Sequence, residues 1–176
     1  MKDINGNYDF VFMRDSFYED FMFDDVIVEY DHYNGIFKPY GGLWLSPYIS
    51  QIYGYVSDWK NFVEDKLPYK DISHCTVFSI KDDANVLILN DPFEFARNYP
   101  LLVTPLRPDS PSLVLCNVKF DKIVEYGYDA FYLSNEALEW TNPYSTDSPI
   151  RLFGWDVESL FVINKDILIE KDKFIL

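Results

Sequence analysis

Cysteine and histidine are scarce in this chain, with two of each among 176 residues. Cys75 and Cys116 lie far apart in separate apolar runs, so the sequence has neither a disulfide framework nor a CxxC pair. We expect both thiols to be buried, because cysteine in such a run behaves as a small hydrophobic residue. Since no HExxH motif or His/Cys cluster is present, we assign no metal site and do not expect metal catalysis.

Basic residues are also few. The chain has 15 Lys and Arg against 29 Asp and Glu, which gives a formal net charge of -14. Phosphate contacts require clusters of Lys and Arg, so tight direct binding of nucleic acid is not expected. An acidic surface can instead occupy the basic channel of another protein, and the composition leaves this functional class open.

Long apolar runs are missing as well. No segment has the basic start and apolar stretch of a signal peptide, and none approaches the length that crosses a bilayer. We therefore expect a cytoplasmic protein that does not enter the membrane.

Aromatic residues, in contrast, are abundant: 14 Tyr, 15 Phe and 4 Trp in a chain that is 48% hydrophobic. This content favours strands and is enough for one core of ordinary size. No linker, repeat or low-complexity stretch divides the sequence, so residues 1–176 are interpreted as a single domain.

Short apolar runs between turn residues predict a strand-rich α+β domain. Helices are predicted at 57–65, 91–99 and 120–126, the first two because Ser57 and the Asp91-Pro92 pair have the form of helix starts. Residues 26–30 are either a short strand or the end of a loop. Further strands are predicted at 8–14, 43–46, 74–80, 86–90, 130–133, 155–163 and 167–176, and loops at 100–111 and 135–149.

Residues 38–47, KPYGGLWLSP, contain two adjacent glycines ahead of an aromatic strand. Glycine allows backbone to approach a ligand closely, which favours a nucleotide-type pocket. The same pair serves a turn that needs positive φ, and for an isolated Gly-Gly this second interpretation is the more common one.

Four segments follow one another in an order that is similar to the sequence pattern of a known family. KPYGGLWLSP, DWKNF (58–62), YGYDAFYL (126–133) and GWDVESLFVIN (154–164) resemble the pattern of a family of small, largely uncharacterised phage and bacterial proteins. The pattern also resembles, more distantly, the ADP-ribosyltransferase fold. That resemblance implies two small, mainly antiparallel sheets with peripheral helices.

The resemblance also implies a site for NAD, which would be bound as a substrate. Arg14 would hold the pyrophosphate, although a surface ion pair with Asp15 is an equal alternative. Gly41 and Gly42 would pass beneath the nicotinamide ribose. The remaining contacts would come from Trp44 or Tyr40 stacking on the ring and from a hydrogen bond of Ser46; the alternative for Trp44 is core packing.

A late carboxylate would stabilise the oxocarbenium-like centre that forms as nicotinamide leaves. On a strand, Asp156 and Glu158 would share one face while Trp155 and Val157 packed on the other. The resemblance implies that Glu158 is catalytic. Ser159 is the alternative occupant of this position, and a serine there would not stabilise positive charge.

Two functions follow as hypotheses. The first is a phage-type or bacterial mono-ADP-ribosyltransferase that binds NAD and transfers ADP-ribose to a protein or nucleic-acid target of the host. The second is a non-catalytic acidic protein, an anti-defence inhibitor or nucleic-acid mimic, that engages a host factor through its carboxylates.

Overall fold

The computed structural model describes residues 8–17, 23, 39, 41–50, 56–105, 116–141, 148–150, 152 and 154–176. The fold of these residues is α+β, as the sequence predicted. The strands are β1 (Asp9–Arg14), β2 (Leu43–Pro47), β3 (His74–Ile80), β4 (Val86–Leu89), β5 (Val103–Pro105), β6 (Cys116–Val118), β7 (Ala130–Leu133), β8 (Ser159–Val162) and β9 (Leu168–Ile175). The helices are α1 (Asp58–Lys66), α2 (Pro92–Asn98), α3 (Phe120–Glu125) and α4 (Asn135–Thr141), with 3-10 turns at Pro100–Leu102 and Lys165–Ile167.

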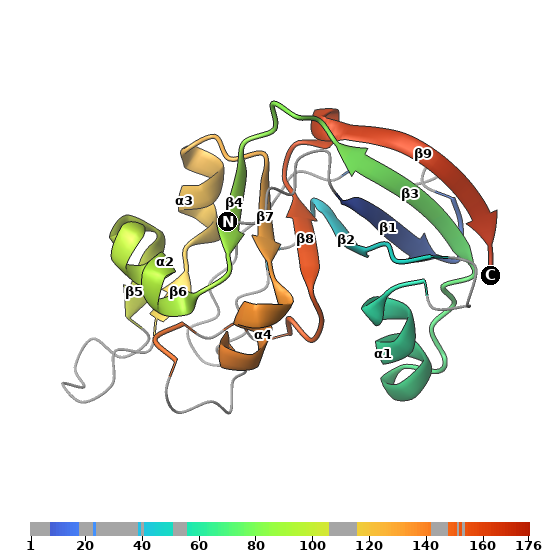
Figure 1. The fold of residues 1–176 in the computed structure, drawn as a ribbon, viewed down its shortest axis with the longest axis horizontal. Helices are drawn as coiled ribbons and strands as arrows, with labels where there is room; N and C mark the ends of the chain where they lie inside the picture. Colours follow the sequence, from blue (N-terminus) through green and yellow to red (C-terminus); the bar gives the residue numbers. More distant parts are fainter. Residues whose placement is uncertain are drawn as a thin grey trace.

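Seven strands form one mixed sheet in the order β4-β7-β8-β2-β1-β3-β9, and β5 and β6 form a separate two-stranded ribbon (Figure 1). Only β4 and β7 pair in parallel within the sheet. The expected pair of small sheets packed together is therefore not what the described residues form. The reason is β2, which pairs with β1 on one side and with β8 on the other and so joins the strands into a single sheet.

The predicted helix starts are confirmed by their hydrogen bonds. Ser57 Oγ accepts the Lys60 N–H at 3.2 Å, and Asp91 Oδ1 accepts the N–H groups of Phe93 and Glu94 at 2.7 and 3.0 Å. Each oxygen satisfies donors that the first turn of a helix leaves without an internal partner. The expected segment at 26–30 lies outside the described residues.

Three predicted boundaries are wrong. The expected loop at 135–149 begins with α4, because Ser134 Oγ accepts the Ala137 N–H at 3.3 Å and starts a helix there. The expected loop at 100–111 begins with a 3-10 turn followed by β5. The strand expected at 155–163 starts only at Ser159, so Asp156 and Glu158 precede it.

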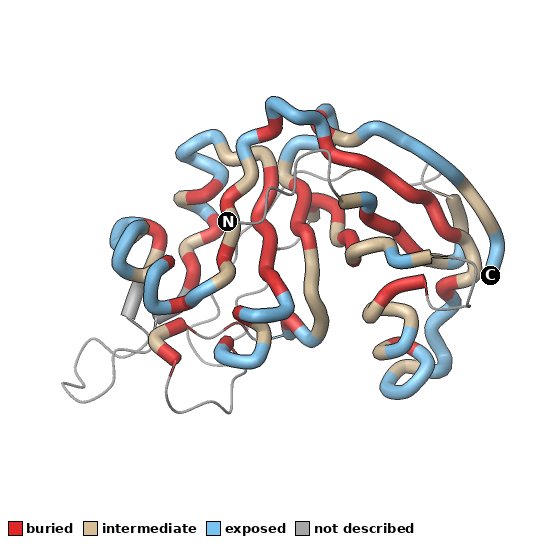
Figure 2. Tube along the Cα trace, viewed as in Figure 1, coloured by how far each residue is buried: buried red, intermediate tan, exposed pale blue. Residues whose placement is uncertain are grey.

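The two faces of the sheet carry different clusters of buried side chains. All four helices cover one face: α1 packs on Val11, Met13 and Cys75, whereas α2, α3 and α4 pack around Phe131 and Phe161. The opposite face carries a second layer, formed by Phe10, Phe12, Leu43, Leu45, Phe78, Ile80, Ala130, Tyr132, Leu160 and Val162. Figure 2 shows buried residues along the inner strands, while most of β9 is exposed.

In the part of the chain described, no helix has both the length and the apolar character needed to cross a membrane.

Candidate functional site

A cavity of about 810 Å³ opens where β1 and β2 separate. The two strands pair only at Phe10 with Pro47 and at Val11 with Ser46. Beyond these positions β1 continues beside β3 up to Arg14, whereas β2 stays paired with β8. The two strands thus diverge, and we call the space between them the wedge cavity. Its lining includes Val11, Phe12, Met13, Arg14, Leu43, Trp44, Leu45 and Ser46 from the two strands.

The glycine pair forms the turn that leads into β2. Gly41 and Gly42 have φ of 72° and 59°, a region that other residues rarely adopt, and both line the wedge cavity. A Cβ on Gly42 would lie 2.6 Å from Phe161 Cε2 and 2.6 Å from the Val162 carbonyl oxygen. The close approach that requires glycine at position 42 is therefore an approach to β8 within the chain.

Trp44 is half-buried, and it both packs against the core and lines the cavity. Its ring lies 4.5 Å from that of Trp155 and 4.6 Å from that of Phe161, measured between centroids. The same side chain lines the wedge cavity. Core packing, one of the two interpretations of Trp44, is thus observed, and it leaves part of the indole facing the cavity.

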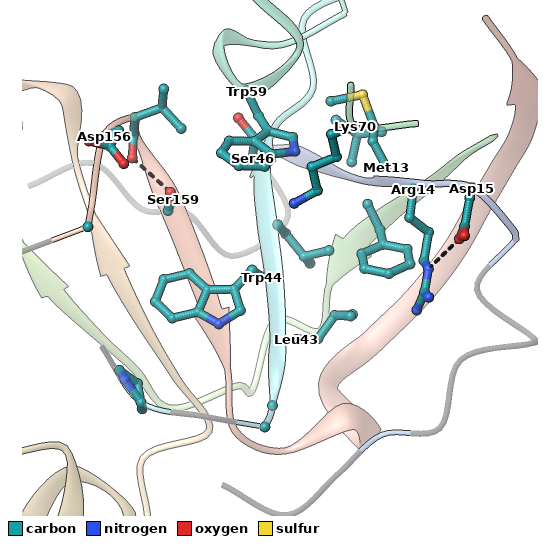
Figure 3. Close-up of a pocket in the computed structure, with 18 of the residues that line it drawn as sticks. Met13, Arg14, Asp15, Leu43, Trp44, Ser46, Trp59, Lys70, Asp156 and Ser159 are labelled. Atoms are coloured by element: carbon teal, nitrogen blue, oxygen red, sulfur yellow. Dashed lines mark hydrogen bonds and ion pairs between the residues drawn. The ribbon is translucent and has the colours of Figure 1, made fainter. Parts of the chain in front are cut away.

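Two predicted residues of the late segment, Asp156 and Ser159, line the cavity beside Trp44. Asp156 is exposed, and Ser159 Oγ donates a hydrogen bond of 2.7 Å to the Val157 carbonyl. Figure 3 shows Asp156, Ser159 and Trp44 on one side of β2, with Arg14 and Asp15 on the other. Residues 112 positions apart are linked here, because Ser46 Oγ donates to the Glu158 carbonyl at 3.5 Å.

The Glu158 side chain lies elsewhere. It is not among the residues that line the wedge cavity, and its carboxylate accepts a hydrogen bond from the hydroxyl of Tyr132. Tyr132 is fully buried on the face of the sheet opposite the helices. Burial raises the pKa of Tyr132 far above its ordinary value, and the hydrogen bond to Glu158 raises it further. The described geometry does not bring Glu158 and Arg14 together.

Arg14 stands at the end of β1, opposite His74. Its Nε donates to Asp15 Oδ1 at 3.1 Å, and the two side chains are 37% and 63% exposed. This is the surface ion pair that the sequence left open as an alternative, and such an exposed pair adds little stability. Arg14 also lines the wedge cavity, so the guanidinium is near any anion bound there. Tyr40 lies outside the described residues.

The lining also includes residues that were not singled out in the sequence, among them Trp59, Lys70 and Asp71. Lys70 Nζ lies 4.8 Å from the centre of the Trp59 ring, in a cation–π arrangement. The N–H of Ser73 donates to Asp71 Oδ1 at 2.9 Å and lowers the pKa of Asp71, which keeps this carboxyl ionised. Of these three residues, only Trp59 had a signal in the sequence that could have drawn attention to it, namely its position in the first turn of a predicted helix.

The wedge cavity thus combines indole rings, cations and carboxylates. Trp44 and Trp59 supply flat apolar surfaces, Arg14 and Lys70 supply positive charge, and Asp156 supplies an exposed carboxylate. Such a set can stack an aromatic ring, hold an anionic group and stabilise a developing cation. Within the described ranges, no group of three or more His, Cys, Asp or Glu side chains could hold a metal ion.

Comparison of the chain with protein-family models, with curated proteins and with solved structures found no match.

Proposed function

We propose that the protein binds NAD in the wedge cavity and acts as an ADP-ribosyltransferase-like enzyme on a macromolecule of a bacterial host. One observation carries the proposal. Three segments that are distant in sequence line one cavity. They are the end of β1 at Arg14, the segment from Gly41 to Ser46, and the segment with Asp156 and Ser159. Its volume of about 810 Å³ is within the range typical of pockets for small molecules and cofactors.

The chemistry of the lining suits the parts of a dinucleotide. Trp44 offers a ring for stacking, and the carboxylate of Asp156 lies on the same side of β2. Arg14 and Lys70 offer donors to a pyrophosphate, and a guanidinium can do so through two parallel hydrogen bonds. The two glycines add backbone without side chains to the lining of the cavity.

Of the two acids in the late segment, Asp156 is the one that faces the cavity. We therefore assign Asp156 the role of stabilising the oxocarbenium-like centre as the bond to nicotinamide breaks, with Ser159 beside it. Glu158, which the family resemblance favours, would have to leave the Tyr132 hydroxyl to reach the same place. Its role as the catalytic acid stays a prediction that the same experiment tests.

The first measurement is binding of NAD by calorimetry and by quenching of tryptophan fluorescence, since Trp44 and Trp59 line the cavity. We expect saturable binding that weakens in Arg14→Gln and Trp44→Phe variants. ADP-ribose and nicotinamide, tested separately, show which half of the dinucleotide supplies the affinity. Absence of saturable NAD binding would overturn the proposal.

The second measurement is transfer of label from biotinylated NAD to proteins and nucleic acids of a bacterial lysate. Asp156→Asn and Glu158→Gln form a matched pair, because each removes one negative charge from the same segment. We expect Asp156→Asn to lower transfer by about 100-fold or more while NAD binding persists, as for loss of one group that stabilises transition-state charge. The reverse result, with loss only in Glu158→Gln, would assign the reaction to Glu158.

A lack of both binding and transfer would favour the acidic binding protein that the net charge of -14 allows. Pull-down from a lysate at low and at high salt tests that alternative, because charge-driven association weakens as salt screens it.

A further inference from the structure

Among the strands that the structure describes, β9 is the last of the seven in spatial order and forms one edge of the sheet. Four consecutive side chains of β9, at positions 169–172, are exposed, and Ile175 is 63% exposed. An edge strand presents backbone N–H and C=O groups that another strand can pair with. The edge formed by β9 is therefore a candidate site for pairing with a further strand.

The order of residues in β9, LIEKDKFI, is complementary to itself when reversed. Read from either end, the strand has two apolar residues followed by two charged residues. At each charged position, the forward order and the reversed order have residues of opposite charge. We propose that two copies of the chain pair through β9 in antiparallel orientation, around a two-fold axis between Lys171 and Asp172. The two seven-stranded sheets would then form one continuous sheet.

This register places an acid opposite a base at each charged position. Lys171 would face Asp172 of the other copy, and Glu170 would face its Lys173, each pair occurring twice through the symmetry. The apolar positions also match. Opposite pairs on an antiparallel ladder have their Cβ atoms about 5 Å apart, close enough for these contacts. The apolar pairs would be Leu168 with Ile175 and Ile169 with Phe174.

The register also satisfies a geometric requirement, because residues opposite each other must lie on the same face of the sheet. In a regular strand, Leu168 and Ile175 would lie on opposite faces, since they are seven positions apart. The β9 strand has an irregularity: Asp172 pairs with Val77 and Glu170 with Phe78, which leaves Lys171 as an extra residue. A bulge of this kind shifts the alternation by one.

As a result, the partners share a face. Leu168 lies opposite Ile80 of β3 and Ile175 opposite His74, and these two β3 positions are six apart and so on one face. The other pairs agree in the same way: Ile169 and Phe174 lie opposite Ser79 and Cys75, and Glu170 and Lys173 lie opposite Phe78 and Thr76.

Charged residues on an edge usually discourage pairing. In β9 they discourage parallel in-register pairing, which would place each charge opposite its like, whereas the proposed antiparallel register matches all four charged positions. Within one copy, Lys173 Nζ lies 3.0 Å from Glu170 Oε2, and the Lys173 N–H donates to Asp172 Oδ1 at 2.8 Å. These contacts are local, and the side-chain ion pair between half-exposed groups contributes little, so it can be exchanged for the pair across the axis.

One strand from each copy makes a small interface, so we expect a dimer that forms as concentration rises. Sedimentation equilibrium should show the mass increasing from 20.8 kDa toward twice that value. Both Lys171→Glu and Asp172→Lys place like charges opposite each other twice, and each should raise the dissociation constant about tenfold. The double variant Lys171→Asp with Asp172→Lys restores both pairs and should restore dimerisation.

The Asp172→Lys variant separates this pairing from general charge effects, because it makes the chain less acidic and yet is expected to weaken association. Lys66→Glu on α1 is the matched control for Lys171→Glu, since it changes the net charge equally at an exposed site away from β9. Circular dichroism checks that each variant is folded. A chain that stays monomeric at every concentration would overturn the proposal, as would single variants that dimerise normally or a double variant that does not recover.

Discussion

At the scale of single residues, the hydrogen bond between Tyr132 and Glu158 concerns both the stability of the fold and the proposed function. Tyr132 is fully buried, and its hydroxyl donates to the carboxylate of Glu158, for which the resemblance predicts a catalytic role. A buried hydroxyl needs such an acceptor, because burial without one costs stability. The present position of Glu158 is therefore explained by the needs of Tyr132, whatever further role the acid has.

We expect Tyr132→Phe to lower the free energy of unfolding by about 1–2 kcal/mol, because the half-buried Glu158 loses a donor. Urea denaturation at pH 7 measures this, and Tyr126→Phe at an exposed tyrosine should have no effect. The raised pKa of Tyr132 also predicts a pH dependence. Its contribution is present below about pH 10, the unfolded value, and is lost as pH rises further, so the loss of stability at high pH should be smaller in Tyr132→Phe.

Cys75 provides a probe of the core at the same scale. Its side chain is fully buried, and burial raises its pKa to about 12. In a Cys116→Ser background, Cys75 is the sole thiol, and we expect no reaction with a thiol reagent at pH 8 until urea unfolds the chain. The linked stability is present below about pH 9 and decreases as pH rises toward 12. Rapid labelling of the folded chain would contradict this packing.

At the scale of elements, the turn into β2 depends on a single missing Cβ. Gly42 and Gly127 both have positive φ, but only at Gly42 would a Cβ contact Phe161 and the Val162 backbone. We expect Gly42→Ala to cost about 3 kcal/mol, from backbone strain together with overpacking. Gly127→Ala, which meets nothing within 4 Å, should cost about 1 kcal/mol from strain alone.

Urea denaturation of the two glycine variants measures the difference between these costs. Equal losses would show that the approach of the glycine turn to β8 contributes no stability.

The elements that the sequence predicted well are those with local signals. Ser57 and Asp91 cap their helices through contacts within three residues, and short-range rules describe such contacts. The same rules were sufficient to find α4, since Ser134 precedes a helix-forming segment, but the turn residues further along favoured a loop. The start of β8 at Ser159 could not be found this way, because it depends on pairing with β2 and β7.

At the scale of the whole molecule, composition predicts a single domain, but it does not predict the wedge cavity. The sequence indicated which strand carries Trp44 and Ser46, yet nothing in it shows that β1 and β2 stop pairing after Val11 and Ser46. Lys70 reaches the cavity because α1 docks on β1 and β3 through Val63, which is a tertiary contact. The position of the Glu158 side chain likewise depends on a tertiary contact, the hydrogen bond from Tyr132, which lies 26 positions earlier in the sequence.

The short ladder between β1 and β2 has a consequence for what a bound molecule would do. Six residue pairs join β1 to β3, and four join β7 to β8, but only two join β1 to β2. The ladder between β1 and β2 is thus shorter than either of these two, and the wedge cavity lies where it ends. A molecule held there would contact Met13 of β1 and Trp44 of β2, and would therefore join the two strands where their own hydrogen bonds stop.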